Sequence, residues 1–153
     1  SVAWGDFDND GELDFVVASV HSHMNLESAE MTDRLLRALE SPNIRVIGHP
    51  TGRLLLHREG FPFDFEKIAK EAARRGVAME INASPERLDL TSTLVRAAKA
   101  KGCKFVISTD AHHPKHLGNM TYGVRIARRG WLEAGDILNT LPLAKFTEAI
   151  RPN

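Results

Sequence analysis

The segment STDAHHPKH, residues 108–116, holds one aspartate and three of the seven histidines of the chain. It overlaps the end of an apolar run, KFVIST (104–109), that is typical of a buried strand. A surface loop needs polar side chains, but it does not need imidazole groups. Imidazole and carboxylate groups in combination favour Zn, Mn or Fe over Ca or Mg as a bound metal.

Histidines follow two other apolar, strand-like runs in the same way. The run LDFVVASV (13–20) leads to His21 and His23, and the run IRVIG (44–48) leads to His49. One histidine after a strand is most often a capped or solvent-facing loop residue. Three such strands, one of which adds Asp110 two residues before His112, favour a shared metal site.

The elements that must position these side chains alternate along the chain. Strand-like runs at 13–20, 44–48, 77–82 and 104–109 are separated by segments with helical periodicity. This order predicts an α/β fold in which parallel strands alternate with helices, and the carboxyl ends of such strands meet at one edge of the sheet. Helices are expected over 28–41, 64–76, 91–102, 123–130 and 134–150, the last broken at Pro142.

The composition is that of a globular domain. The chain has 153 residues, 42% hydrophobic and 26% charged, with a formal net charge of zero, so no global basic field indicates nucleic acid. Cys103 is the only cysteine, which excludes an intrachain disulfide, and it is expected in the core. No stretch has the features of a signal peptide or a membrane span, so the expected compartment is the cytoplasm.

Several motifs resemble the C-terminal part of a PHP (polymerase and histidinol phosphatase) domain, closest to the one that ends bacterial family X DNA polymerases. They are VVASVHS, IGHPTGRLL, EINASPERLDL and the stretch from FVISTDAHHPKHLG to ILNTLP. The resemblance implies a distorted (β/α) barrel with a metal centre of Zn or Mn and phosphoesterase activity. In those polymerases the activity is a 3′–5′ exonuclease or end-processing function, so a DNA 3′ end is an expected partner.

The same resemblance implies roles for single residues. The later metal ligands of the family fall on His21, His49, Asp110 and His112, of which Asp110 and His112 are the expected catalytic residues. Side chains expected to line the substrate pocket or hold phosphate are Glu80, Asn82, Arg53, Arg87 and Lys115. The remaining histidines are expected to be neighbours of the site (His23, His113) or surface and second-layer residues (His57, His116).

The chain departs from the family pattern before its first strand-like run. The early His-x-His motif and further early ligands of the family have no counterpart, so the resemblance covers a C-terminal half of the barrel, or a partial barrel. An incomplete ligand set lowers metal affinity. Open edge strands of such a half barrel would favour self-association with a second copy.

The first residues contain a separate acidic pattern. Asp6, Asp8, Asp10 and Asp14 follow D-x-D-x-D-G-x-x-D spacing, which is typical of a calcium loop and resembles an FG-GAP or VCBS repeat. This divides the chain into a calcium-loop-like segment, 1–14, and a PHP-like domain, 15–153. Two alternatives remain: a shortened family segment with Asp6 in place of a bridging Glu, and a plain acidic turn.

Three functions are therefore open. The first is a metal-dependent phosphoesterase acting on a DNA end or, in the manner of histidinol phosphatase, on a phosphorylated metabolite. The second is a metal- or calcium-binding module without turnover. The third is an inactive fragment or chimera whose ligands are idle.

Overall fold

The computed structural model describes residues 2–5 and 15–150, and its centre is one five-stranded sheet. The strands, in spatial order, are β1 (Val2–Gly5), β2 (Phe15–Ala18), β3 (Ile44–Ile47), β4 (Ala78–Asn82) and β5 (Phe105–Ser108). Strands β2 to β5 pair in parallel, and β1 pairs antiparallel with β2. The predicted α/β class is confirmed, because parallel strands alternate with helices in a manner consistent with a partial (β/α) barrel.

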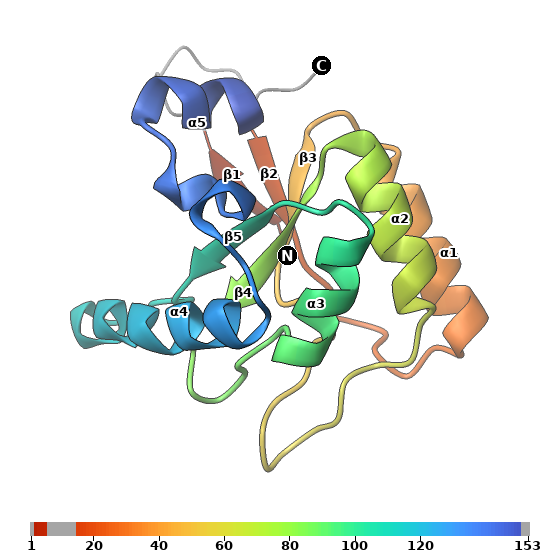
Figure 1. Ribbon diagram of the computed structural model, residues 1–153. Helices are drawn as coiled ribbons and strands as arrows, with labels where there is room; N and C mark the ends of the chain where they lie inside the picture. Colours follow the sequence, from red (N-terminus) through yellow and green to blue (C-terminus); the bar gives the residue numbers. More distant parts are fainter. Residues whose placement is uncertain (1, 6–14, 151–153) are drawn as a thin grey trace.

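Helices cover one face of this sheet and extend past its end. The α-helices are α1 (Ser28–Leu39), α2 (Phe65–Arg75), α3 (Ser92–Ala100), α4 (Met120–Arg129) and α5 (Leu143–Ile150). Figure 1 shows α1, α2 and α3 side by side, and α4 contacts α3 and β5. None of the helices in the described ranges is long and apolar enough to cross a membrane.

The bounds of α2 illustrate why these segments fold as they do. The Asp64 carboxylate accepts a hydrogen bond from the Lys67 backbone N–H at 3.0 Å, which caps the first turn. Gly76 ends the helix with a φ of 66°, a left-handed conformation that glycine adopts without a steric penalty. The buried face consists of Ile68, Ala69 and Ala72.

The core lies between the helices and one face of the sheet. Met79, Ile81 and Phe105 are fully buried there, against residues of α2 and α3. Cys103 is buried beside them, with its thiol directed to the Ala69 carbonyl oxygen at 3.1 Å. Burial raises the pKa of this thiol to about 11, which confirms Cys103 as a core residue. Because strand side chains alternate, the residues between these core positions face the other side of the sheet.

The C-terminal third differs from the sequence prediction in detail. The helix expected to begin at Gly123 begins at Met120, after a 3₁₀ segment over Pro114–Asn119. Gly123 therefore lies inside α4. A Cβ at this position would approach the Ala83 Cβ to 3.0 Å, so the close packing requires glycine. The helices expected over 134–150 are two short 3₁₀ turns followed by α5, which begins directly after Pro142.

The expectation of open barrel edges is wrong for β5. The Asn139 side chain covers its outer edge, accepting from the Ile107 N–H at 2.7 Å and donating to the Ile107 carbonyl at 3.1 Å. A bridge between Phe105 and Ile137 continues this cover. At the other side, β1 pairs with β2 along its length, so residues 2–5 lie in the same sheet as the parallel strands.

Candidate active site

A cavity of about 420 Å³ lies on the sheet face opposite the helical core. Alternating side chains of the parallel strands line it, continued by the residues that directly follow these strands. The lining residues are Val17, Ser19 and His21; Val46 and His49; Glu80 and Arg87; and Val106, Ser108, Asp110 and His112. All four predicted metal ligands therefore share one cavity.

His21 and His49 are the closest pair of histidine rings in this cavity. Their ring centroids are 4.8 Å apart, and the ring planes are nearly perpendicular at 87°. His21 is exposed, whereas His49 is 5% exposed and its Nδ1 has no hydrogen-bond partner among the described residues. A buried ring nitrogen without a partner beside a second imidazole is an arrangement that suits metal ligation.

The backbone turns sharply where β3 delivers His49. His49 has a φ of 29°, and Asp110, which follows β5, has a φ of 50°. Non-glycine residues adopt this left-handed region at a cost of about 1–3 kcal/mol, and such strain is concentrated at functional sites. The residue before His49 is Gly48. A Cβ at this position would meet the Ser19 hydroxyl and would lie 3.0 Å from the Val17 Cγ1, so the packing requires glycine.

Asp110 is held by one side chain from β4 and one from the loop that follows β4. Its Oδ2 accepts hydrogen bonds from the Asn82 side-chain amide and from the Arg87 Nε, each at 3.3 Å. His112 is exposed, and its Nδ1 lies 2.7 Å from the Asp110 backbone oxygen. When Nδ1 donates this bond, the Nε2 of His112 carries the free lone pair. Nε2 can then bind a metal ion or accept a hydrogen bond from a ligand.

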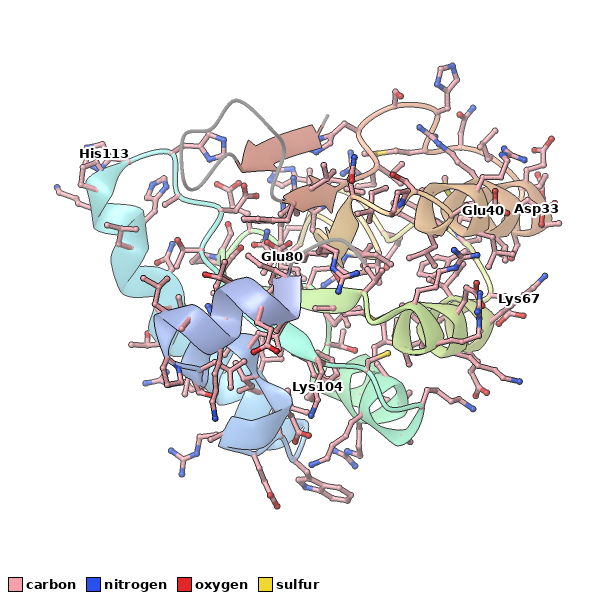
Figure 2. All side chains as sticks on the ribbon, turned by 90° about the horizontal axis from the view of Figure 1, so that it is seen from above. Asp33, Glu40, Lys67, Glu80, Lys104 and His113 are labelled. Carbon is pink, nitrogen blue, oxygen red and sulfur yellow. The ribbon has the colours of Figure 1, made fainter. Side chains whose placement is uncertain are left out.

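Glu80 is the buried carboxylate at the floor of the cavity. It is 6% exposed and accepts hydrogen bonds from the His49 backbone N–H, the Ser108 hydroxyl and, at 3.4 Å, the Asn82 side-chain amide. Figure 2 shows Glu80 near the centre of the molecule, whereas His113 lies at its periphery. Burial raises the pKa of Glu80, and the hydrogen bonds it accepts oppose that shift.

Burial also determines the charge state of the two neighbouring histidines. It lowers the pKa of His49 to about 4, with smaller contributions in the same direction from Arg87 and His21. Burial is the largest cause that lowers the pKa of His21 as well. Both rings are therefore neutral at pH 7, which is the form that binds metal ions.

Several predicted site residues lie outside the cavity lining. The Arg53 guanidinium donates to the backbone oxygens of Arg87 (2.8 Å) and Leu88, so it joins two loops. Asn82 is fully buried and acts through its bonds to Glu80 and Asp110. The remaining predicted residues outside the lining are exposed: His23, His57, His113, Lys115 and His116.

The donor set fits a borderline metal ion better than a hard one. Three imidazoles and one carboxylate are groups that Zn, Mn and Fe accept. Among residues 15–150, no three His, Cys, Asp or Glu side chains converge in the arrangement of a formed metal site. The four calcium-loop aspartates Asp6, Asp8, Asp10 and Asp14 lie outside the described residues.

The sequence prediction missed the two serines of the cavity and one buried carboxylate. Ser19 lies two residues before His21, and Ser108 lies two residues before Asp110. The period of two along a strand could have identified both. Asp89 is fully buried, and its side chain binds the loop that follows His49. No local pattern signals that contact, because the two partners are far apart in the sequence.

Three known proteins are similar to this chain in sequence. The chain is 37% identical over 150 residues to the DNA polymerase/3′-5′ exonuclease PolX of Bacillus subtilis, covering 97% of this chain and 26% of that protein. It is 31% identical over 117 residues to a probable phosphatase of Clostridium acetobutylicum, covering 71% of this chain and 45% of that protein. A probable phosphatase of Shewanella loihica is 30% identical over 141 residues, covering 87% of this chain and 55% of that protein.

These relatives are consistent with a PHP-like domain of phosphoesterase type. The chain spans about a quarter of the PolX relative and about half of the two phosphatases. No family model matches the chain. Neither the relatives nor a family model supports the FG-GAP or VCBS resemblance of the first residues.

Proposed function

We propose that this domain hydrolyses phosphoesters with the help of divalent metal ions. The observation that carries the proposal is the shared cavity, which His21, His49, Asp110 and His112 line together with Arg87. The relatives are named as an exonuclease and as probable phosphatases, which supports a phosphorylated substrate.

The residues of the cavity have distinct roles in this proposal. His21, His49, Asp110 and His112 would hold Zn or Mn, which when bound would supply an activated water and a partner for phosphate oxygens. Asp110 and His112 are the proposed catalytic residues. Arg87 keeps Asp110 oriented from one side, and Asn82 does so from the adjacent strand.

The substrate proposed first is the 3′ end of a DNA strand. The similarity to PolX supports it, because that alignment covers nearly the whole chain. The alternative is a phosphorylated metabolite, as for histidinol-phosphate-type hydrolases, and the phosphatase relatives support it. The cations that would hold the phosphate groups are Arg87 within the cavity and Arg53 and Lys115 outside its lining.

The relatives extend beyond the region that this chain matches, so further ligands are proposed to come from outside residues 15–150. They come from parts of the relatives outside the matched region or from a second copy of the chain. Within the described residues, β1 is the edge strand that Asn139 does not cover, so it is the edge proposed for a second copy. Calcium binding at Asp6, Asp8, Asp10 and Asp14 remains a separate proposal.

One set of measurements tests the function. Metal content is determined by mass spectrometry after incubation with Mn, Zn or Ca, and hydrolysis is followed on a 3′-hydroxyl oligonucleotide and on p-nitrophenyl phosphate. We expect bound Mn or Zn, and activity that Asp110→Asn abolishes and Asp136→Asn retains, since Asp136 lies outside the cavity. A folded, metal-loaded chain without activity on either substrate would contradict the proposal.

A further inference from the structure

The loop that carries His49 is held by two buried carboxylates, of which only one lies in the cavity. Glu80 accepts the His49 backbone N–H from the cavity side. Asp89 accepts the Thr51 N–H at 2.9 Å and the Gly52 N–H at 3.0 Å through a single oxygen, Oδ2. Asp89 is fully buried and does not line the cavity, so it touches neither a substrate nor a metal ion there.

Asp89 is itself fixed to the strand that carries Glu80. Its backbone forms an antiparallel bridge with Asn82, in which each residue donates to the carbonyl of the other. Asn82 in turn donates to Asp110. A short path of hydrogen bonds therefore leads from the loop after His49, through Asp89 and Asn82, to the carboxylate of Asp110.

A second contact joins the same two loops. The guanidinium of Arg53 donates to the carbonyls of Arg87 and Leu88, and Arg87 donates to Asp110. The loop after β3 and the loop after β4 are thus connected by Asp89, by Arg53 and by a backbone bond from the Leu55 N–H to the Glu86 carbonyl at 2.7 Å. Asp89 acts nearest to His49 along the sequence, because its partners Thr51 and Gly52 are two and three residues after His49.

The strained backbone explains why such a contact is needed. His49 has a φ of 29°, a strained conformation that an unsupported loop would relax. Two N–H groups directed at one buried oxygen oppose that relaxation, because losing the acceptor leaves buried donors unsatisfied. The Gly52 N–H also donates to the His49 carbonyl at 2.9 Å, so the contact acts on the His49 peptide itself.

From this geometry we infer that Asp89 is a positioning residue, which holds the imidazole of His49 in its ligating orientation by fixing the loop 49–52. The inference rests on the proposed function for its consequence, since His49 is there a metal ligand. Groups that orient metal ligands through hydrogen bonds, without touching the metal, typically contribute 10- to 100-fold to metal affinity.

The test compares Asp89→Ala with two other variants. Asp89→Asn keeps one oxygen for both N–H groups, and its amide replaces Oδ1, which accepts no hydrogen bond within residues 2–5 and 15–150. Asp136→Ala is the matched control, because the Asp136 carboxylate also accepts a backbone N–H, that of Glu133 at 2.9 Å, but lies outside the cavity. The probe is Mn²⁺, titrated calorimetrically into the folded full chain.

We expect Asp89→Ala to weaken Mn²⁺ binding by roughly 10- to 100-fold. Asp89→Asn should bind Mn²⁺ with an affinity within about threefold of that of the unmodified chain. Asp136→Ala should leave the Mn²⁺ affinity unchanged, even if this variant loses as much stability as Asp89→Ala. An Asp89→Ala chain that folds and binds Mn²⁺ as the unmodified chain does would overturn the inference. If Asp89→Ala does not fold, Asp89→Ser takes its place, since its shorter side chain cannot reach both N–H groups.

A metal-free measurement separates this inference from the proposed function. In ¹H–¹⁵N spectra of the imidazole nitrogens, Asp89→Ala should shift or broaden the His49 signals and leave those of the exposed His57 unchanged. If the unmodified chain binds no Mn²⁺, the proposed function fails for this chain, and the His49 signals alone decide the role of Asp89. Unchanged His49 signals in the folded variant would refute that role.

Discussion

Burial holds His49 neutral in the folded chain, and this makes folding depend on pH. The pKa of His49 is lowered to about 4, against an ordinary value of 6.5. Below pH 6.5 the unfolded chain therefore binds a proton that the folded chain does not. The contribution of neutral His49 is fully present above pH 6.5 and is lost as the pH falls toward 4.

This predicts a difference between the unmodified chain and His49→Gln. Without metal, His49 should reduce the free energy of unfolding by as much as roughly 3 kcal/mol between pH 7 and pH 4. The variant should lack this component, because glutamine does not titrate. Urea unfolding at several pH values in the presence of a chelator measures both. Parallel pH dependences of the two chains would contradict the assigned pKa.

Gly48 allows a second prediction at the scale of one residue. Gly48→Ala places a methyl group against Ser19 and Val17, so it should lower the free energy of unfolding by about 1–3 kcal/mol. Gly135→Ala is the control, since a Cβ there meets no atom within 4 Å. Urea unfolding of the two variants measures the difference. Equal stability of both would mean that the β2–β3 contact is looser than described.

The sequence predicts the strand-end residues of the site better than the residues that hold them. His21, His49 and Asp110 could be identified because each follows an apolar run directly, and His112 because it lies two residues after Asp110. Asp89 could not, because its partners Thr51 and Gly52 lie on another loop and no period in the sequence relates the two. Contacts between loops depend on tertiary packing, which local patterns do not encode.

At the scale of elements, the four parallel strands and the helices between them follow from the sequence. Apolar runs of strand length and glycine at Gly76 and Gly102 are strong signals. β1 has no such signal, since four residues are too few to show a period. The 3₁₀ segment before α4 was missed because proline and glycine in PKHLGN are typical of a loop. Short or irregular elements depend on tertiary contacts with other segments, which a local sequence pattern does not show.

The edge of β5 gives a prediction at this scale. Asn139→Ala removes the amide that binds both backbone groups of Ile107, so it should lower the free energy of unfolding by about 1–3 kcal/mol. It should also increase self-association, because the freed edge can pair with another chain. Asn119→Ala is the control, since Asn119 makes no side-chain cap hydrogen bond.

Sedimentation velocity and urea unfolding of the two asparagine variants check this prediction. A monomeric Asn139→Ala chain of unchanged stability would show that other residues cover β5 sufficiently.

At the scale of the whole molecule, bound metal should stabilise the fold. The proposed ligands follow three different strands, so unfolding would separate them and release a bound metal. At Mn²⁺ concentrations of about 100 times Kd, the free energy of unfolding should rise by about 2.7 kcal/mol. Thermal unfolding with Mn²⁺, and again after a chelator is added, measures this gain.

The same gain should be absent in His49→Gln, which lacks one ligand. A thermal midpoint that Mn²⁺ leaves unchanged, in a chain shown to be folded, would argue against a metal site formed from several strands. An equal gain in the variant would place the metal elsewhere in the molecule.

The left-handed backbone at His49 and Asp110 has a consequence for how such a sequence can change over generations. Glycine adopts this conformation without strain, so a population of variants selected only for heat resistance should enrich glycine at both positions. Selection for turnover should instead retain the imidazole and the carboxylate. Sequencing two such populations from one library would show whether thermal stability and catalysis select different residues at these two positions.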